Sequence, residues 1–299
     1  MLTMRDRRGF TLIELLVVII MLGIVSLSVS KVVIGSLRIS RSQMIQADLQ
    51  SNVRTGGLVL PLELREIGYD SSVFTNAVSS DVEAIGTDWA QFRAMRGMGY
   101  TCGTPALTEF RIRKPPQGFR DPLMTDGFML FVESDKNIGI DDQWAPLIVT
   151  AIDYNSTCGA DSAIALTVLP PSLAALVPVQ LSMVFVGGPI RYYERMRFGA
   201  FVDADGRTYM GARSVSLGEL AYRAVAGPLH ADNPIRFRYY NRAGVQVAPG
   251  AVNPVEVRTI DIELRGVTRD SVNLAGSLAR RTGAMTVQTR VALRNTLRH

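Results

Sequence analysis

Glu14 carries the clearest chemical signal in this sequence. It is the one charged residue between Arg8 and Lys31, in a stretch that is otherwise largely apolar. An ionised side chain at the depth of a bilayer costs about 2.5–3.5 kcal/mol on insertion scales. The position therefore indicates either a segment that does not simply sit in lipid or an acid that has a partner. The alternative is a snorkelling acid on a plain anchor helix.

Other residues that could do chemistry form no catalytic or metal-binding pattern. The chain has two histidines, His230 and the terminal His299, so histidine-dependent acid–base chemistry could rest only on His230. Residues 203–206 and 135–142 hold acids at near-calcium spacing, but neither matches the calcium loop with its closing Glu. The first is interpreted as a turn, and calcium binding at the second is an open question. We expect no enzyme, no catalytic residue, no cofactor and no metal site.

The apolar stretch predicts a membrane-spanning helix. About 22 residues between Arg8 and Lys31 make a helix of about 33 Å, enough for a hydrocarbon core of about 30 Å. The preceding cations, with Arg5 and Arg7 among them, place the N-terminus in the cytoplasm and the rest of the chain outside it. The alternative is a secretory signal peptide. Its weak cleavage site would lie at one of three serines, Ser26, Ser28 and Ser30.

The sequence around Glu14 resembles the processing and assembly motif of type IV pilins and type II secretion pseudopilins. The motif is GFTLIELL, and it follows a short basic leader that ends in Gly9. The resemblance implies that a prepilin peptidase cuts between Gly9 and Phe10 and N-methylates Phe10. It also implies that Glu14 is the assembly residue, which pairs with the N-terminal ammonium of a neighbouring subunit. Two such charges on adjacent helices neutralise one another where neither would be tolerated alone.

Beyond the apolar stretch the helix is expected to continue with one apolar face. Ile45, Leu49 and Val53 recur at intervals of four residues, and polar residues lie between them. The pattern predicts that the helix reaches about Arg54.

A break or kink is expected next, at Gly56, Gly57 and Pro61. A second short helical segment is expected over residues 62–69. This segment resembles the signature at the end of the long helix in minor pilins of the PilW class. The match is partial, because no cysteine follows Tyr69.

From Phe128 onward the sequence predicts strands. Short runs of β-branched or aromatic residues are bounded by Gly, Pro, Asp or Asn. In residues 255–264 the apolar phase slips between Val257 and Ile260, which predicts a β-bulge. Hairpin turns are expected at residues 203–206 and 241–244. The other predicted strands are residues 128–133, 147–154, 163–169, 181–186, 235–240 and 285–293. We expect an α+β, pilin-like fold in which a C-terminal antiparallel sheet packs on the long N-terminal hydrophobic helix.

The C-terminal part extends the resemblance to large minor pilins and their pseudopilin counterparts. A tyrosine-rich hairpin with Tyr239 and Tyr240, a strand at residues 257–264 and a last strand ending at Asn295 occur in the same order. A chain of 299 residues is also longer than a typical major pilin. The resemblance therefore implies a minor pilin that primes type IV pilus assembly near the tip. The alternatives are a type II secretion minor pseudopilin and a membrane-anchored extracytoplasmic enzyme or binding domain.

Cys102 and Cys158 are the two cysteines of the chain, and they lie on the predicted extracytoplasmic side, where disulfides persist. A bridge between them would contribute about 4 kcal/mol in the loop-entropy model. Two free buried thiols are the alternative. Without nearby histidines the pair cannot supply four zinc ligands.

The sequence thus predicts four segments with different roles. They are a cleaved leader (1–9), a transmembrane and filament-core helix (10–37), an amphipathic continuation (38–69) and an extracytoplasmic β-rich head (70–299). The expected partners are prepilin peptidase, other pilin and minor pilin subunits through the N-terminal helix, and the inner membrane before assembly. The net charge of +5 is modest and scattered, so we expect no nucleic acid partner. The expected location is the inner membrane with a periplasmic head, and the pilus after assembly.

Overall fold

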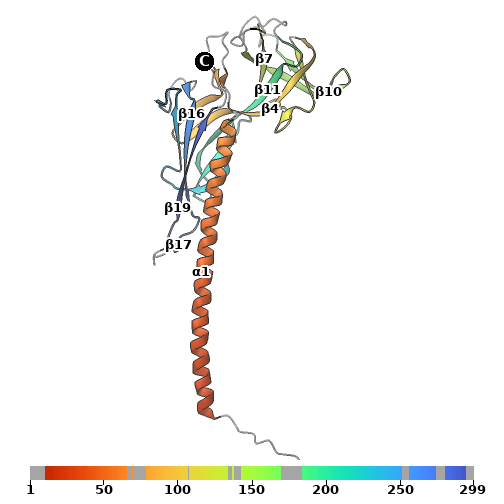
Figure 1. Cartoon of the computed structure of the whole chain (residues 1–299). Coiled ribbons are helices and arrows are strands. Elements are labelled where there is room, and N and C mark those ends of the chain that lie inside the picture. The colour runs from red at the N-terminus through yellow and green to blue at the C-terminus, as the bar shows by residue number, and fades with distance from the viewer. Residues whose placement is uncertain are drawn as a thin grey trace, which may run out of the picture. The chain divides into compact units, whose positions relative to one another are not determined.

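The N-terminal part of the chain is a long helix, α1 (Leu12–Arg65). The computed structural model in Figure 1 describes residues 11–65, 67, 69–70, 79–106, 108–133, 137, 143–169, 184–250, 256–273 and 280–293. The chain divides into two compact units. The first comprises Met1–Asp48 with Thr268–Gly283, and the second comprises Leu49–Val267 with Ala284–His299.

Helix α1 continues for 54 residues, so the predicted break at Gly56, Gly57 and Pro61 is wrong. At Gly56 the helix approaches the sheet closely, since a Cβ added there would lie 2.8 Å from Cβ of Ala226. The glycine therefore serves close packing rather than a turn. Pro61 is buried beside Leu60, and burial of apolar surface offsets the backbone hydrogen bond that a proline inside a helix removes.

The two parts of α1 differ in what their apolar side chains contact. In the second unit the helix buries one stripe whose residues are spaced by three or four, as expected for an amphipathic helix. The stripe consists of Leu49, Val53, Gly56, Leu60, Pro61 and Leu64. In the first unit the large apolar side chains from Leu12 to Leu37 are exposed.

The second unit is built on a sheet of fifteen strands. Their bounds are β3 (Val82–Ile85), β4 (Trp89–Ala106), β5 (Glu109–Arg113), β6 (Gln117–Gly118), β7 (Gly127–Val132), β8 (Gln143–Leu147), β9 (Val149–Cys158), β10 (Asp161–Val168), β11 (Pro189–Val202), β12 (Thr208–Ser214), β13 (Arg223–Leu229), β14 (Ile235–Tyr240), β15 (Gln246–Val247), β16 (Thr259–Val267) and β19 (Ala284–Ala292). The main path runs β15-β14-β16-β13-β12-β11-β4-β5-β10-β9. The remaining strands pair with members of this path or with one another, and β19 pairs with β16.

All of these pairings are antiparallel, so the predicted α+β layout of a long apolar helix and a large antiparallel sheet is confirmed. Two short ladders lie outside the large sheet. One joins β1 (Tyr69–Asp70) to β2 (Ser79–Ser80), and the other joins β17 (Val272–Asn273) to β18 (Arg280–Arg281).

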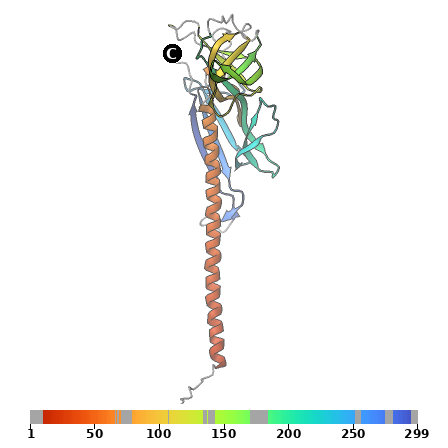
Figure 2. The ribbon, with the colours of Figure 1, turned by 90° about the vertical axis from the view of Figure 1, so that its right-hand side faces the viewer.

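Two hydrophobic cores lie within the second unit. The first contains the buried stripe of α1 and the inner faces of β16 and its neighbours, and the second lies among β5, β7 and β10. The long strands β4 and β11 run through this unit (Figures 1 and 2). Strand β11 contributes Met196 and Phe198 to the first core and Ile190 and Tyr192 to the second. It therefore couples the sheet that packs on the helix to the rest of the unit.

Several sequence predictions in the sheet are confirmed. Strands β7, β10, β14 and β19 correspond to residues 128–133, 163–169, 235–240 and 285–293. At the first predicted turn, the N–H of Gly206 donates to the carbonyl of Asp203 at 2.9 Å. At the second, the N–H of Gly244 donates to the carbonyl of Asn241 at 3.0 Å.

The predicted bulge between Val257 and Ile260 is wrong. Strand β16 begins at Thr259 and pairs with both β14 and β19 without a register shift. Val257 is buried but precedes the strand. The slip in the apolar pattern therefore marks the start of the strand.

Two other predicted strands differ from the structure. Residues 147–154 are divided between β8 and β9 at Ile148, because β8 pairs with β7 whereas β9 pairs with β10. Residues 184–186 form no strand. The hydroxyl of Thr101 and the N–H of Gly188 both donate to the carbonyl of Phe185, at 2.7 and 3.0 Å, which holds a turn here. Residues 181–183 lie outside the described residues.

Candidate assembly site on helix α1

Thr11 caps the start of α1. Its Oγ1 accepts the backbone N–H of Glu14 at 3.4 Å, and its carbonyl accepts the N–H of Leu15 at 3.3 Å. Thr at the cap with Glu three residues later is the pattern of a capping box. The bond at Glu14 uses its backbone N–H, so the cap is supplied by Thr11. The sequence reasoning missed this cap, although the Thr-x-x-Glu spacing is readable. The predicted processing residues Gly9 and Phe10 lie outside the described residues.

The carboxylate of Glu14 lies exposed in the first turn of α1. A negative side chain is favoured there by the partial positive charge at the N-terminal end of a helix. The first basic residue of α1 is Lys31, 17 residues further along, or about 26 Å at 1.5 Å per residue. No basic side chain of the described helix can therefore neutralise Glu14.

The surface of α1 around and beyond Glu14 is apolar and exposed. Its most apolar 18-residue window has a mean hydropathy of 2.8, and α1 is the one helix in the described ranges that is long and apolar enough to cross a membrane. A helix that is apolar on all sides is stable in lipid or among other helices. Composition alone also fits a secretory signal sequence, so the distinction rests on the residues around Gly9.

Comparison with known families identifies this segment. Residues 4–30 match the family model of the prokaryotic N-terminal methylation motif. The matched segment contains the basic leader, Gly9, Phe10 and Glu14, followed by most of the apolar stretch. The match indicates a substrate of prepilin peptidase of the type IV pilin or pseudopilin type, a class with a structural role. No curated protein and no solved structure gave a significant match to this chain.

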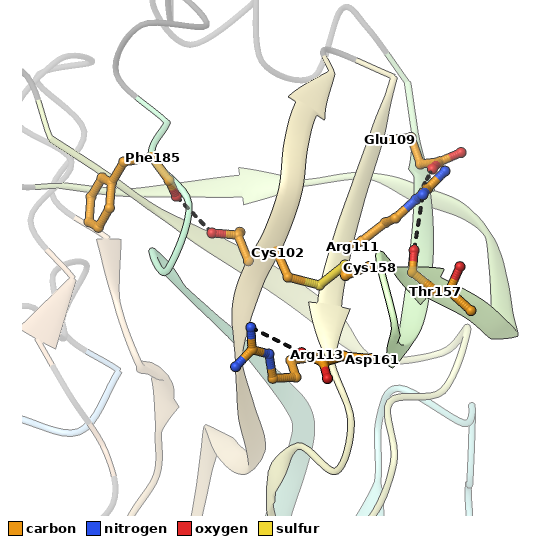
Figure 3. The surroundings of a disulfide bond; sticks show 9 residues. Cys102, Glu109, Arg111, Arg113, Thr157, Cys158, Asp161 and Phe185 are labelled. Atoms are coloured by element: carbon orange, nitrogen blue, oxygen red, sulfur yellow. Dashed lines mark hydrogen bonds and ion pairs between the residues drawn. A yellow bond between two sulfur atoms is a disulfide. The ribbon is translucent and has the colours of Figure 1, made fainter.

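Cys102 in β4 and Cys158 in β9 are joined by a disulfide, with their Cα atoms 5.9 Å apart (Figure 3). Strands β5 and β10 lie between β4 and β9 in the sheet. The bond therefore links two strands that are not neighbours and holds this part of the sheet in a curled form. An ion pair between Arg113 and Asp161 at 3.3 Å lies nearby.

A cluster of three charged side chains joins the end of α1 to the sheet. Arg96 on β4 contacts Glu63 of α1 at 3.0 Å and Glu194 of β11 at 2.8 Å. Burial raises the pKa of Glu194, but hydrogen bonds from Ser214 and Arg96 outweigh it and hold this pKa below its ordinary value of 4.5. The sequence analysis did not find this cluster, because its members lie far apart in the chain.

The remaining candidate residues from the sequence have local structural roles. Nδ1 of His230 accepts the backbone N–H of Asp232 at 3.0 Å within one loop. Asp205 accepts the N–H of Arg207 at 2.9 Å and the hydroxyl of Tyr209 at 2.7 Å. These bonds lower the pKa of Asp205, with the Arg207 N–H as the largest cause. They make the segment a hydrogen-bonded turn.

No metal centre is evident in the part of the chain that the structure describes. Within it, no three His, Cys, Asp or Glu side chains are placed to hold a metal ion. The acidic segment 135–142, where calcium binding is an open question, lies outside the described residues apart from Asn137.

Proposed function

We propose that this chain is a minor pilin that takes part in priming the assembly of a type IV pilus, near the tip of the filament. Prepilin peptidase cuts between Gly9 and Phe10 and methylates the new N-terminus. The observation that carries the proposal is the position of Glu14. It lies in the first turn of an exposed apolar helix, inside a match to the methylation motif.

Cleavage supplies the partner that Glu14 requires. The leader takes three arginines and one aspartate with it, which lowers the formal net charge from +5 to +3. Cleavage leaves one new ammonium group, on the backbone nitrogen of Phe10, next to the cap of α1. This ammonium pairs with Glu14 of a neighbouring subunit. The pairing fixes the axial offset of the two helices, because a slip of one turn, about 5.4 Å, leaves both charges unpaired.

The location follows from the same segment. Before assembly the helix spans the inner membrane once, with the leader in the cytoplasm and the β-rich head in the periplasm. The Cys102–Cys158 disulfide supports an oxidising compartment for the head. During assembly the exposed apolar side chains of α1 exchange lipid for the helices of other subunits. Residues 10–37 would form the filament core, and residues 38–69 would continue it toward the head.

A minor pseudopilin of a type II secretion system is the second candidate. The methylation motif fits it equally well, and both candidates use the same cleavage and helix packing. The partial signature at residues 62–69 and the length of the chain favour a minor pilin of the PilW class. Co-purification with pilus subunits or with secretion-system subunits from the native host separates the two.

Substitutions at Glu14 test the proposal while keeping the helix start intact. Gln can still serve in a capping box but carries no charge, so Glu14→Gln removes only the ion pair. We expect normal cleavage at Gly9 and loss of incorporation into filaments. Glu14→Asp, which keeps the charge, is the matched control and should retain more incorporation. Normal incorporation of Glu14→Gln would show that assembly does not need the charge of Glu14 and would overturn the pairing.

A further inference from the structure

Strand β19 lies at an edge of the large sheet. In the part of the chain that the structure describes, six strands of this sheet pair with a single other strand, namely β3, β6, β8, β9, β15 and β19. Three of them are short, with four residues in β3 and two each in β6 and β15. Strand β8 contains Pro146, and β9 pairs with β10 through two register shifts. Short length, proline and bulges all protect a sheet edge from pairing with another chain.

Strand β19 has none of these protective features. It is nine residues long, contains no proline and pairs with β16 without a register shift. Its one charged residue is Arg290, whose guanidinium donates to the carboxylate of Asp261 on β16 at 2.6 and 2.7 Å. The charge is therefore turned back toward β16 and does not guard the free edge. Among the described strands, β19 is the one long and regular edge.

Hydrogen bonds at the two ends of β19 show which of its backbone groups bond to β16. Beyond one end, the N–H of Leu293 donates to the carbonyl of Arg258 at 2.9 Å. Before the other end, the N–H of Thr268 donates to the carbonyl of Gly283 at 2.9 Å. Alternate residues of an antiparallel strand point their backbone groups to the same side. The odd-numbered residues of β19 therefore bond to β16.

The even-numbered residues of β19 direct their backbone groups to the free edge. Thr286, Gln288 and Arg290 present their N–H and C=O groups there, and no strand of the described residues pairs with this side of β19. A row of such groups on extended backbone is complementary to another extended strand. The chemistry of the edge thus specifies a strand as its partner.

The apolar layer under α1 is incomplete at the same edge. Val287 faces the helix, because a Cβ added to Gly57 would lie 3.1 Å from its Cγ1. Met285 and Val287 are half-buried, whereas Ile262 and Leu264 on the neighbouring strand β16 are 2% and 1% exposed. An added strand with apolar residues at alternate positions would cover this side of the layer.

The edge does not suit a second copy of β19. Gly56 of α1 approaches Leu264, and Gly266 lies against Val53, so β16 runs antiparallel to the helix and β19 runs in the same direction as the helix (Figure 1). An antiparallel two-fold pair of β19 strands would make the two α1 helices antiparallel. The proposed function, on which this step rests, requires both helices to cross one membrane in the same direction. A parallel two-fold pair would put the second helix on the opposite face of the sheet and leave the apolar layer uncovered.

We propose that the free edge of β19 is a docking site for an extended strand of a different protein chain. The partner strand bonds to the backbone of Thr286, Gln288 and Arg290. Its alternate apolar side chains turn toward α1 and complete the layer beside Val287. Backbone hydrogen bonds supply the affinity, and the apolar alternation selects the strand.

The test uses the full chain in detergent and a synthetic peptide as the probe. The peptide has the sequence of residues 259–267, TIDIELRGV, which already pairs with the other side of β19 as strand β16. Amide hydrogen exchange is resolved to single residues. In the isolated chain we expect fast exchange at Thr286, Gln288 and Arg290, and the peptide should slow it. A control peptide of the same composition, in which the apolar residues are consecutive, should have no effect.

Substitutions at Gln288 separate its backbone from its side chain. Gln288→Pro removes one N–H at the free edge, where proline is tolerated, and should weaken peptide binding at least about fivefold, the effect of about one hydrogen bond. Gln288→Ala keeps the N–H and should bind the peptide normally. Slow exchange at Met285 and Val287 in the proline variant shows that β19 still pairs with β16. If that protection is lost, Thr286→Pro, nearer the end of the strand, replaces it.

Three outcomes would overturn the proposal. Slow exchange at the three edge amides in the isolated monomer would show that the chain covers its own edge. Protection that rises with protein concentration would assign the edge to a second copy. Failure of the peptide to slow exchange, or equal binding by the proline and alanine variants, would show that the edge takes no strand. None of these measurements depends on cleavage at Gly9, so a failure here is distinguishable from a failure of the proposed function.

Discussion

Arg96 Nη1 lies 3.0 Å from Glu63 Oε2, and Nε of the same guanidinium lies 2.8 Å from Glu194 Oε2. One side chain on β4 therefore joins α1 to β11. The side chains of Arg96 and Glu194 are each 12% exposed, so the pair is largely shielded from water. Breaking this pair leaves a largely desolvated carboxylate on Glu194 with only the longer contact to Arg120, at 3.7 Å. The cluster fixes the C-terminal end of the helix on the sheet.

Replacing Arg96 with Met should therefore destabilise the second unit. We expect a loss of about 3 kcal/mol in the free energy of unfolding, because Glu63 loses its 3.0 Å contact and Glu194 keeps only the longer contact to Arg120, at 3.7 Å. Denaturant titration of the full chain in detergent measures it. Arg223→Met is the matched control, since Arg223 pairs with Glu219 but is 69% exposed, and a surface pair contributes about 0–1 kcal/mol. Equal effects of the two substitutions would contradict this account of the cluster.

Gly56→Ala should destabilise the packing of α1 on the sheet. The new Cβ would lie 2.8 Å from Cβ of Ala226 and 3.1 Å from Cδ1 of Leu264, and overpacking of this kind costs about 1–3 kcal/mol. Gly35→Ala is the control in the same helix, because nothing lies within 4 Å of its added Cβ. It should instead gain up to about 1 kcal/mol of helix propensity. The two substitutions should shift the denaturation midpoint in opposite directions. If Gly56→Ala also stabilised the protein, the close approach of Gly56 to the sheet would be contradicted.

Removal of the disulfide should weaken the part of the sheet around the second core. Cys102 and Cys158 are separated by 56 residues, and a cross-link of this span contributes about 4 kcal/mol in the loop-entropy model. We expect the double substitution to Ser to lower the free energy of unfolding by about this amount. The first core, which contains β16, should lose less stability than the second, which contains β10. Backbone amides of β10 should therefore exchange with solvent earlier than those of β16. Uniform loss of protection in both strands would contradict this expectation.

The lowered pKa of Glu194 predicts an acid-dependent loss of stability. A carboxyl group whose pKa is lower in the folded state contributes stability above its unfolded pKa, near 4.5, and loses it as the pH falls through the folded value. Glu194→Gln should therefore be less stable than the native chain at pH 7, and the difference should shrink below pH 4.5. Unfolding titrations at several pH values measure this. A difference that stays constant with pH would show that the charge of Glu194 is not involved.

The sequence predicted the helix, the later hairpins and the C-terminal strands because their apolar residues follow the helical or strand period. It did not predict β4, whose glycines lower strand propensity. The structure shows why those glycines are there. A Cβ on Gly99 would lie 3.0 Å from Ile112, and one on Gly97 would overlap the ring of Tyr192. Such requirements come from tertiary packing and are invisible in a local pattern.

The candidate site shows the same contrast between local features, which a sequence reveals, and contacts between distant segments, which it does not. Glu14 and the Gly9–Phe10 junction could be proposed as a site from the sequence, because one charge in an apolar stretch and a Gly-Phe junction are local features. The Arg96 cluster could not, because it depends on contacts between segments that are far apart in the chain. The predicted helix break failed for a related reason. Glycine and proline weaken an isolated helix, but burial against the sheet outweighs that cost here.

The N-terminus of the mature protein tests the central claim most directly. The full chain is isolated from membranes of a cell that contains prepilin peptidase, and its N-terminal peptide is analysed by mass spectrometry. The account predicts a chain that begins at N-methylated Phe10, and an uncleaved chain when Gly9 is replaced by Ala. A mature chain that retains Met1, or one that begins after Ser30, would contradict it.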